Sequence, residues 1–93
     1  MSAEEELGGM IGRQVVIDAR APYVYLGTLD SFTECFVTLR DVDVHDATDS
    51  HCTKEMYIME ARKLGVQRNR ASVKILRSEI VSISLLSDVV VFE

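Results

Sequence analysis

The chain has 93 residues, of which 47% are hydrophobic and 27% charged, with five Gly and one Pro. A chain this short supports one small hydrophobic core, so we expect a single domain over residues 1–93 with an ordered, globular composition. The acidic N-terminus, MSAEEELGGM, has neither a basic start nor a long apolar run, which argues against a secretory signal and a membrane span and predicts a cytoplasmic protein. Without a secretory context, the two cysteines are predicted to be thiols rather than a disulfide.

The charges are unevenly distributed along the chain. The formal net charge of −5 argues against non-specific binding to nucleic acid. Residues 1–60 carry twelve acidic and four basic side chains, whereas residues 61–93 carry six basic and three acidic ones. The six bases all lie between Arg62 and Arg77, a stretch without an acid. This basic stretch is either a solvated face or a local patch that an anionic ligand would meet.

The first predicted element is a short helix, because Ser2 and Glu5 have the spacing of a capping box and Gly8-Gly9 ends the pattern. Strands are predicted over residues 14–18, 23–32, 36–44, 71–76 and 80–86, where β-branched and aromatic residues gather between turn signals. Gly27 lies inside the second of these strands and indicates a bulge, a bend or a close backbone approach. Residues 88–93 are also β-prone and could form an edge strand or a partner-facing segment.

A helix is predicted over residues 53–65, where Tyr57, Ala61 and Leu64 share one face and Gly65 is suited to the position after the helix. Its N-cap candidates are Asp49, Ser50 and Thr53. This helix belongs to an insertion at about residues 45–70, between the third and fourth strands. The elements together predict a mainly β fold, a small and strongly bent barrel or roll.

Two motifs in the strands resemble the Sm-like (LSm) proteins and their bacterial host-factor branch. The first motif is carried by Tyr25, Gly27, Leu29 and Phe32, followed by Val37, Leu39 and Asp41, and the second by VKILRSEIVSI (73–83). The resemblance implies an Sm-like, strongly bent five-stranded antiparallel barrel with a short N-terminal helix and the helical insertion between strands three and four. It also implies a homo-oligomeric ring, in which the fourth strand of one chain pairs with the fifth of the next and removes exposed strand edges.

The same resemblance points to a site for single-stranded RNA, although the motifs differ from the family pattern. RNA-binding members carry Asp and Asn after the second strand and an Arg-Gly turn after the fourth, where this chain has TECF (33–36) and RSE (77–79). Phe36 could stack on a base and Arg77 could contact a phosphate or a base edge. The alternative is that Phe36 lies in the core and Arg77 is merely solvated. The candidate RNA-binding residues are Cys35, Phe36, Arg68, Arg70, Arg77 and Ser78.

Three functions follow, in order of preference. The first is a non-enzymatic, ring-forming protein that binds single-stranded RNA, and the second is an oligomeric protein-interaction module with a degenerate RNA site. No nucleophile elbow or phosphate-cradling loop is present, so neither catalysis nor a cofactor is expected.

The third function is a metal-binding module that uses the stretch DVDVHDATDSHC (41–52). If the third strand continues, Asp41, Asp43 and His45 would share one face, with His51 or Cys52 closing the site. The other interpretation is a solvated turn whose acids neutralise part of the adjoining basic stretch, and no metal ligand is assigned.

Overall fold

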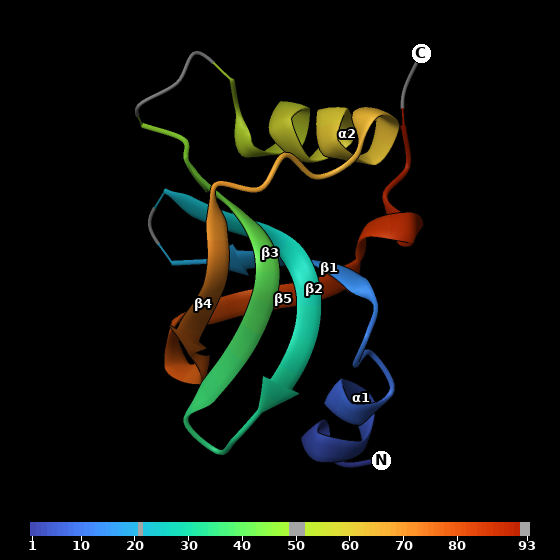
Figure 1. Ribbon diagram of the computed structural model, residues 1–93, viewed down its shortest axis with the longest axis vertical. Helices are drawn as coiled ribbons and strands as arrows, with labels where there is room; N and C mark the ends of the chain where they lie inside the picture. Colours follow the sequence, from blue (N-terminus) through green and yellow to red (C-terminus); the bar gives the residue numbers. More distant parts are fainter. Residues whose placement is uncertain (21, 49–51, 92–93) are drawn as a thin grey trace.

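The computed structural model describes residues 1–20, 22–48 and 52–91 and shows a strongly bent sheet with a helix at either end (Figure 1). Its elements in chain order are α1 (Ala3–Gly8), β1 (Gln14–Ala19), β2 (Tyr23–Phe32), β3 (Phe36–Asp46), α2 (Lys54–Leu64), β4 (Arg70–Leu76), the short 3-10 turn η1 (Arg77–Glu79), β5 (Ile80–Leu85) and the second 3-10 turn η2 (Leu86–Asp88). The predicted helices and five strands are therefore confirmed, and β3 is two residues longer than expected. No strand forms over residues 89–91, and residues 92–93 lie outside the described part.

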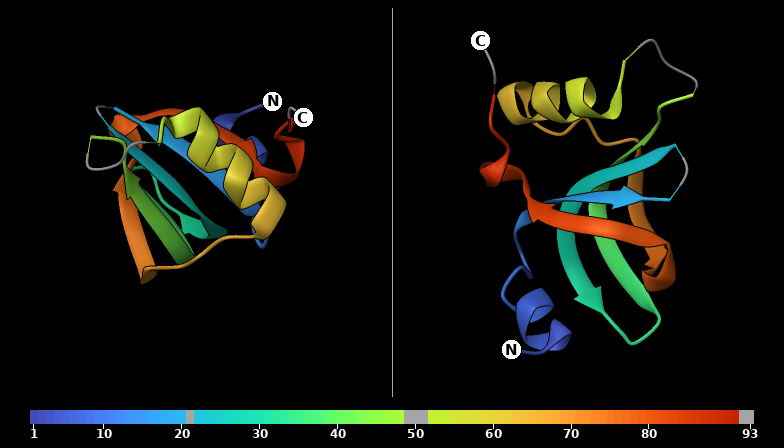
Figure 2. Two further views of the ribbon diagram at one scale, coloured as in Figure 1. Left: turned by 90° about the horizontal axis from the view of Figure 1, so that it is seen from above. Right: turned by 180° about the vertical axis from the view of Figure 1, so that it is seen from behind.

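All strand pairs are antiparallel, in the order β4-β3-β2-β1-β5. The sheet bends so strongly that β5 crosses over β2 and β3, behind them in Figure 1 and in front of them in the view from behind in Figure 2. The strand order makes β4 and β5 the two edges of the sheet. Within the described residues, no helix has the length and apolar character needed to span a membrane.

The bent sheet has a hydrophobic core on each side. The first core, inside the bend, consists of Val15, Ile17, Leu29, Val37, Leu39, Val42 and Ile75. The second core lies between the sheet and α2 and consists of Val16, Val24, Leu26, Ile58, Ala61 and Leu86. Because neighbouring residues of a strand face opposite sides, β1 supplies Val15 to the first core and Val16 to the second. Short apolar runs without polar alternation, such as VVI in β1, are explained by this two-sided burial.

A bulge in β3 divides the strand in two. Leu26 pairs with Asp43 and Thr28 with Arg40, so β3 has one residue more than β2 over this interval. Asp41 takes up the extra length with a φ of 51°. A Cβ on Gly27 would lie 3.1 Å from the carbonyl oxygen of Arg40, closer than side chains normally approach. Any larger residue in place of Gly27 would therefore have to push the two strands apart at the bulge by a few tenths of an ångström.

The bulge reverses which residues of β3 face each core. Val37 and Leu39 enter the first core before the bulge, and Val42 enters it afterwards. Asp43 and His45 consequently turn to the other side of the sheet, toward α2. Asp41 lies at the bulge itself and its carboxylate pairs with Arg68, so among the described residues it does not group with Asp43 and His45 as metal ligands would.

Both helices begin at the predicted kind of cap. The Ser2 hydroxyl accepts a hydrogen bond from the Glu5 amide (3.2 Å), and the Thr53 hydroxyl accepts one from Met56 (3.2 Å). Thr53 is therefore the N-cap of α2, and the other two candidates, Asp49 and Ser50, lie outside the described residues. The Lys54 ammonium, 2.6 Å from the Asp18 carboxylate, ties the start of α2 to β1.

Candidate functional site

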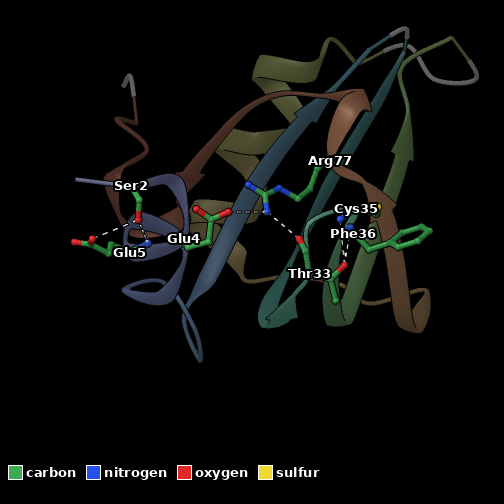
Figure 3. Close-up of polar contacts among 7 residues, drawn as sticks. All are labelled: Ser2, Glu4, Glu5, Thr33, Cys35, Phe36 and Arg77. Carbon is green, nitrogen blue, oxygen red and sulfur yellow. Dashed lines mark hydrogen bonds and ion pairs between the residues drawn. The ribbon is translucent and has the colours of Figure 1, made fainter.

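The β2–β3 loop and turn η1 come together at one end of the molecule (Figure 3). The Arg77 amide donates to the Cys35 carbonyl (2.8 Å), and the Arg77 Nη1 donates to the Thr33 carbonyl (2.8 Å). The Thr33 hydroxyl accepts hydrogen bonds from the amides of Cys35 (3.2 Å) and Phe36 (3.1 Å). The structure thus brings Cys35, Phe36 and the turn that contains Arg77 and Ser78 together, because Phe36 at the start of β3 pairs with Leu76 at the end of β4.

Phe36 is exposed, with 38% of its surface accessible, and Leu76 beside it is 48% accessible. The alternative that Phe36 belongs to the core is therefore wrong. An exposed aromatic ring at the end of a strand is a surface on which a nucleobase can stack. Figure 3 shows the Phe36 ring and the Arg77 side chain pointing to opposite sides of the loop, so one chain does not direct them at a common ligand atom.

Arg77 is not simply solvated, since its side chain is only 22% exposed. Its Nη1 atom also lies 3.5 Å from the Glu4 carboxylate of α1. Among the described residues, Glu4 is the carboxylate that contacts Arg77. This arrangement holds the β2–β3 loop against η1 and reduces the attraction of Arg77 for a phosphate.

Arg68 and Arg70 lie far from this loop. Phe36 pairs with Leu76 and Val42 with Arg70, and six residues of strand correspond to about 20 Å. The Arg68 Nη1 is 2.7 Å from the Asp41 carboxylate, and the Arg70 Nη1 donates to the Asn69 carbonyl (3.0 Å). The structure therefore separates these two arginines from Phe36 and Arg77, and an acid of the stretch 41–52 neutralises part of the basic segment.

A buried polar cluster joins β3 to α2. The Tyr57 hydroxyl donates to Asp43 Oδ2 (2.5 Å), and the Asn69 amide donates to Asp43 Oδ1 (3.1 Å). The Tyr57 ring stacks on His45, with the ring centroids 3.7 Å apart and the planes at 9°. Burial, followed by the hydrogen bond to Asp43, raises the pKa of Tyr57. This cluster holds the insertion on the sheet. Sequence reasoning did not find it, because its geometry depends on the bulge at Asp41.

The residues expected to bind a metal are otherwise engaged. Both carboxylate oxygens of Asp43 accept hydrogen bonds from the protein, and Asp41 pairs with Arg68. Asp46 accepts hydrogen bonds from the hydroxyl (2.6 Å) and amide (2.9 Å) of Thr48, which lower the pKa of Asp46. In the part of the chain that the structure describes, no three His, Cys, Asp or Glu side chains group as metal ligands would. His51, the predicted closing ligand, falls outside that part.

Comparison with known proteins gives a clear result for the fold alone. No family model matches the chain, and no curated protein matches it. The structure is similar to the Pyrococcus abyssii Sm protein solved in complex with a uridine heptamer, with a TM-score of 0.63 and 13% identity over 91% of this chain and 99% of that one.

Two further solved structures show the same similarity. A heptameric archaeal Sm protein matches with a TM-score of 0.55 and 18% identity over 87% of this chain and 96% of that one. The P. aerophilum SmAP1 heptamer matches with a TM-score of 0.58 and 17% identity over 91% and 93%. The chain therefore has an Sm-like fold: a five-stranded antiparallel sheet with a short N-terminal helix, here with a helix between β3 and β4.

Proposed function

We propose that this protein is a cytoplasmic, non-enzymatic subunit of a homo-oligomeric ring that binds single-stranded RNA. The observation that carries the proposal is the convergence of the β2–β3 loop and turn η1, which displays Phe36 and Arg77 at one end of an Sm-like fold. The likeness to an Sm protein solved with a uridine heptamer supports the choice of ligand. Neither Cys35 nor Cys52 forms a disulfide, in keeping with a reducing compartment.

The edges of the sheet support assembly into a ring. β4 and β5 are the two edge strands, and each exposes an apolar residue, Leu76 at 48% and Val81 at 66%. Neither strand contains proline, a common protection of free edges. Pairing β4 of one copy with β5 of the next would satisfy both edges and close the ring.

RNA binding would rest on stacking more than on charge. The Phe36 ring supplies the stacking surface, and among the described residues the contacts of Arg77 engage Nη1 alone. Its Nε and Nη2 groups therefore remain as donors to a base edge or a phosphate. The carboxylate of Glu4, which contacts Arg77, opposes phosphate binding there, so we expect a shallow dependence of affinity on salt.

Fluorescence anisotropy with uridine-rich and adenine-rich oligomers at two salt concentrations tests the proposal. Phe36→Ala should weaken binding by about 1–3 kcal/mol, the usual contribution of base stacking on an aromatic residue. Leu64→Ala is the control, because Leu64 is an exposed apolar residue on α2, away from the β2–β3 loop. Absence of binding at low salt would remove RNA as the ligand.

Light scattering tests the assembly separately. A monodisperse monomer at micromolar concentration would refute the ring. A ring that binds no RNA would favour the second candidate, an oligomeric protein-interaction module, which the contact of the Glu4 carboxylate with Arg77 supports.

A further inference from the structure

A second basic feature lies away from the β2–β3 loop. A cleft of about 410 Å³ separates the C-terminal end of α2 from the start of β1 and turn η2. Gln14 at the start of β1 and Arg13 just before it line one side of the cleft. Arg62 lines it from the last turn of α2, and Ser87 lines it from η2. The insertion helix is thus one wall of the cleft, and the barrel is the other.

The arginines of this cleft differ from most others in the chain. Arg40, Arg68, Arg70 and Arg77 each donate to a carboxylate or a carbonyl oxygen. The guanidinium groups of Arg13 and Arg62, by contrast, donate to no oxygen of residues 1–20, 22–48 and 52–91. No acidic residue lines the cleft either. In a protein with fifteen acidic and ten basic residues, two arginines that face one cleft without a carboxylate form a local positive site.

The donors in the cleft suit a particular chemical group. A guanidinium presents a planar fork of N–H donors that matches the oxygens of a phosphate, and Gln14 and Ser87 add an amide and a hydroxyl. The buried side chains of Ala61 and Leu86 give the cleft an apolar part beside these donors. We propose that this cleft binds a phosphate group, carried by a small nucleotide or by the backbone of an RNA strand.

The cleft is separate from the loop that displays Arg77. Val15 pairs with Leu85 and Ala19 with Ile80, so the start of β1 lies beside the end of β5, whereas η1 precedes its beginning. The length of β5 places about 20 Å between the two ends. The phosphate site therefore does not depend on the RNA site proposed at Phe36 and Arg77.

Titration calorimetry on the full chain with inorganic phosphate, uridine monophosphate and a uridine oligomer tests the inference. We expect saturable binding of at least one probe, weakened about tenfold by Arg62→Gln and similarly by Arg13→Gln, since each removes hydrogen bonds to a charged group. Arg20→Gln is the matched control, because it removes the same charge at a position that does not line the cleft. It should change affinity less than about twofold, as expected for a screened surface charge.

The three probes identify the carrier of the phosphate. Binding of phosphate or uridine monophosphate that Arg62→Gln weakens supports a small ligand, and oligomer binding weakened by Arg62→Gln, with Arg77 intact, supports an RNA backbone. The side chains of both arginines make no hydrogen bond or ion pair within the described residues, so we expect the variants to fold, and thermal melts check this directly. Failure of all three probes to bind saturably, or an equal loss in Arg20→Gln, would overturn the inference. If Phe36→Ala weakens oligomer binding and the arginine variants do not, the oligomer binds at the site of Phe36 and Arg77 and not in the cleft.

Discussion

Substituting Tyr57 with phenylalanine removes one hydroxyl from the polar cluster that joins α2 to β3. The ring that stacks on His45 is retained, so the substitution tests the hydrogen bond to Asp43 and little else. Asp43 is only 3% exposed, so the substitution leaves a largely buried carboxylate oxygen without its tyrosine donor. Asn69 still donates to the other carboxylate oxygen.

The expected loss follows from this geometry. A hydrogen bond to a charged group contributes about 1.5–3 kcal/mol, and a buried acceptor left without a donor falls in the same range. For a chain of this size, 1 kcal/mol corresponds to about 4–8 °C in Tm, so Tyr57→Phe should lower Tm by roughly 10 °C.

Urea unfolding at one fixed protein concentration measures the effect, since stability of a ring would depend on concentration. Tyr23→Phe is the control: Tyr23 is 40% exposed, and its hydroxyl makes no hydrogen bond in the described structure. We expect a change below about 0.5 kcal/mol for Tyr23→Phe, as for most surface substitutions. A loss in Tyr57→Phe no larger than in the control would show that Asp43 does not depend on the tyrosine.

The remaining predictions concern pH, the bulge and Arg77. The pKa of Tyr57 is raised in the folded state, so the folded protein keeps a proton that the unfolded chain loses above about pH 10. The free energy of unfolding should therefore fall as the pH rises from about 9 to about 11. It should fall less in Tyr57→Phe, which lacks this titrating group. Equal slopes in both proteins would contradict this. Gly27→Ala should cost about 1–3 kcal/mol by forcing the strands apart at the bulge, whereas Gly8→Ala, with nothing near its added methyl, should cost nothing in the same melts. If RNA binds at Arg77, Glu4→Gln should tighten binding about two- to fivefold by removing an exposed competing carboxylate. Glu5→Gln removes the same charge from a side chain that faces Ser2, and an equal effect there would exclude a specific role for Glu4.

The strands and helices could be predicted because local signals agreed with the final packing. The Ser2 and Thr53 caps, the break at Gly65 and the β-branched runs each determine structure over a few residues. Residues 88–91 show the limit of such signals. Val89 is β-branched, yet it follows η2, packs on the second core and joins no strand, so its position is set by tertiary packing and not by its β propensity.

The candidate site was predicted in part for a different reason. The pairing of Phe36 with Leu76 could be anticipated from the order of the strands, which brings the β2–β3 loop to η1. The positions of Arg68 and Arg70 could not be anticipated in this way. Both residues follow the insertion, and its path is set by tertiary contacts. The side of the sheet that Asp43 faces could not be predicted either. A single extra residue at Asp41 reverses the alternation, and periodicity alone does not show where that residue falls.

The bulge at Gly27 and Asp41 has a consequence for how this chain tolerates change. It divides β3 into a half that builds the barrel and presents Phe36, and a half that anchors α2 through Asp43 and His45. The two halves share the first core, where Val42 packs with Val37 and Leu39, so a one-residue insertion or deletion at the bulge would disturb this core as well as the attachment of α2. The single extra residue of β3 thus fixes both the interior of the barrel and the position of the helix.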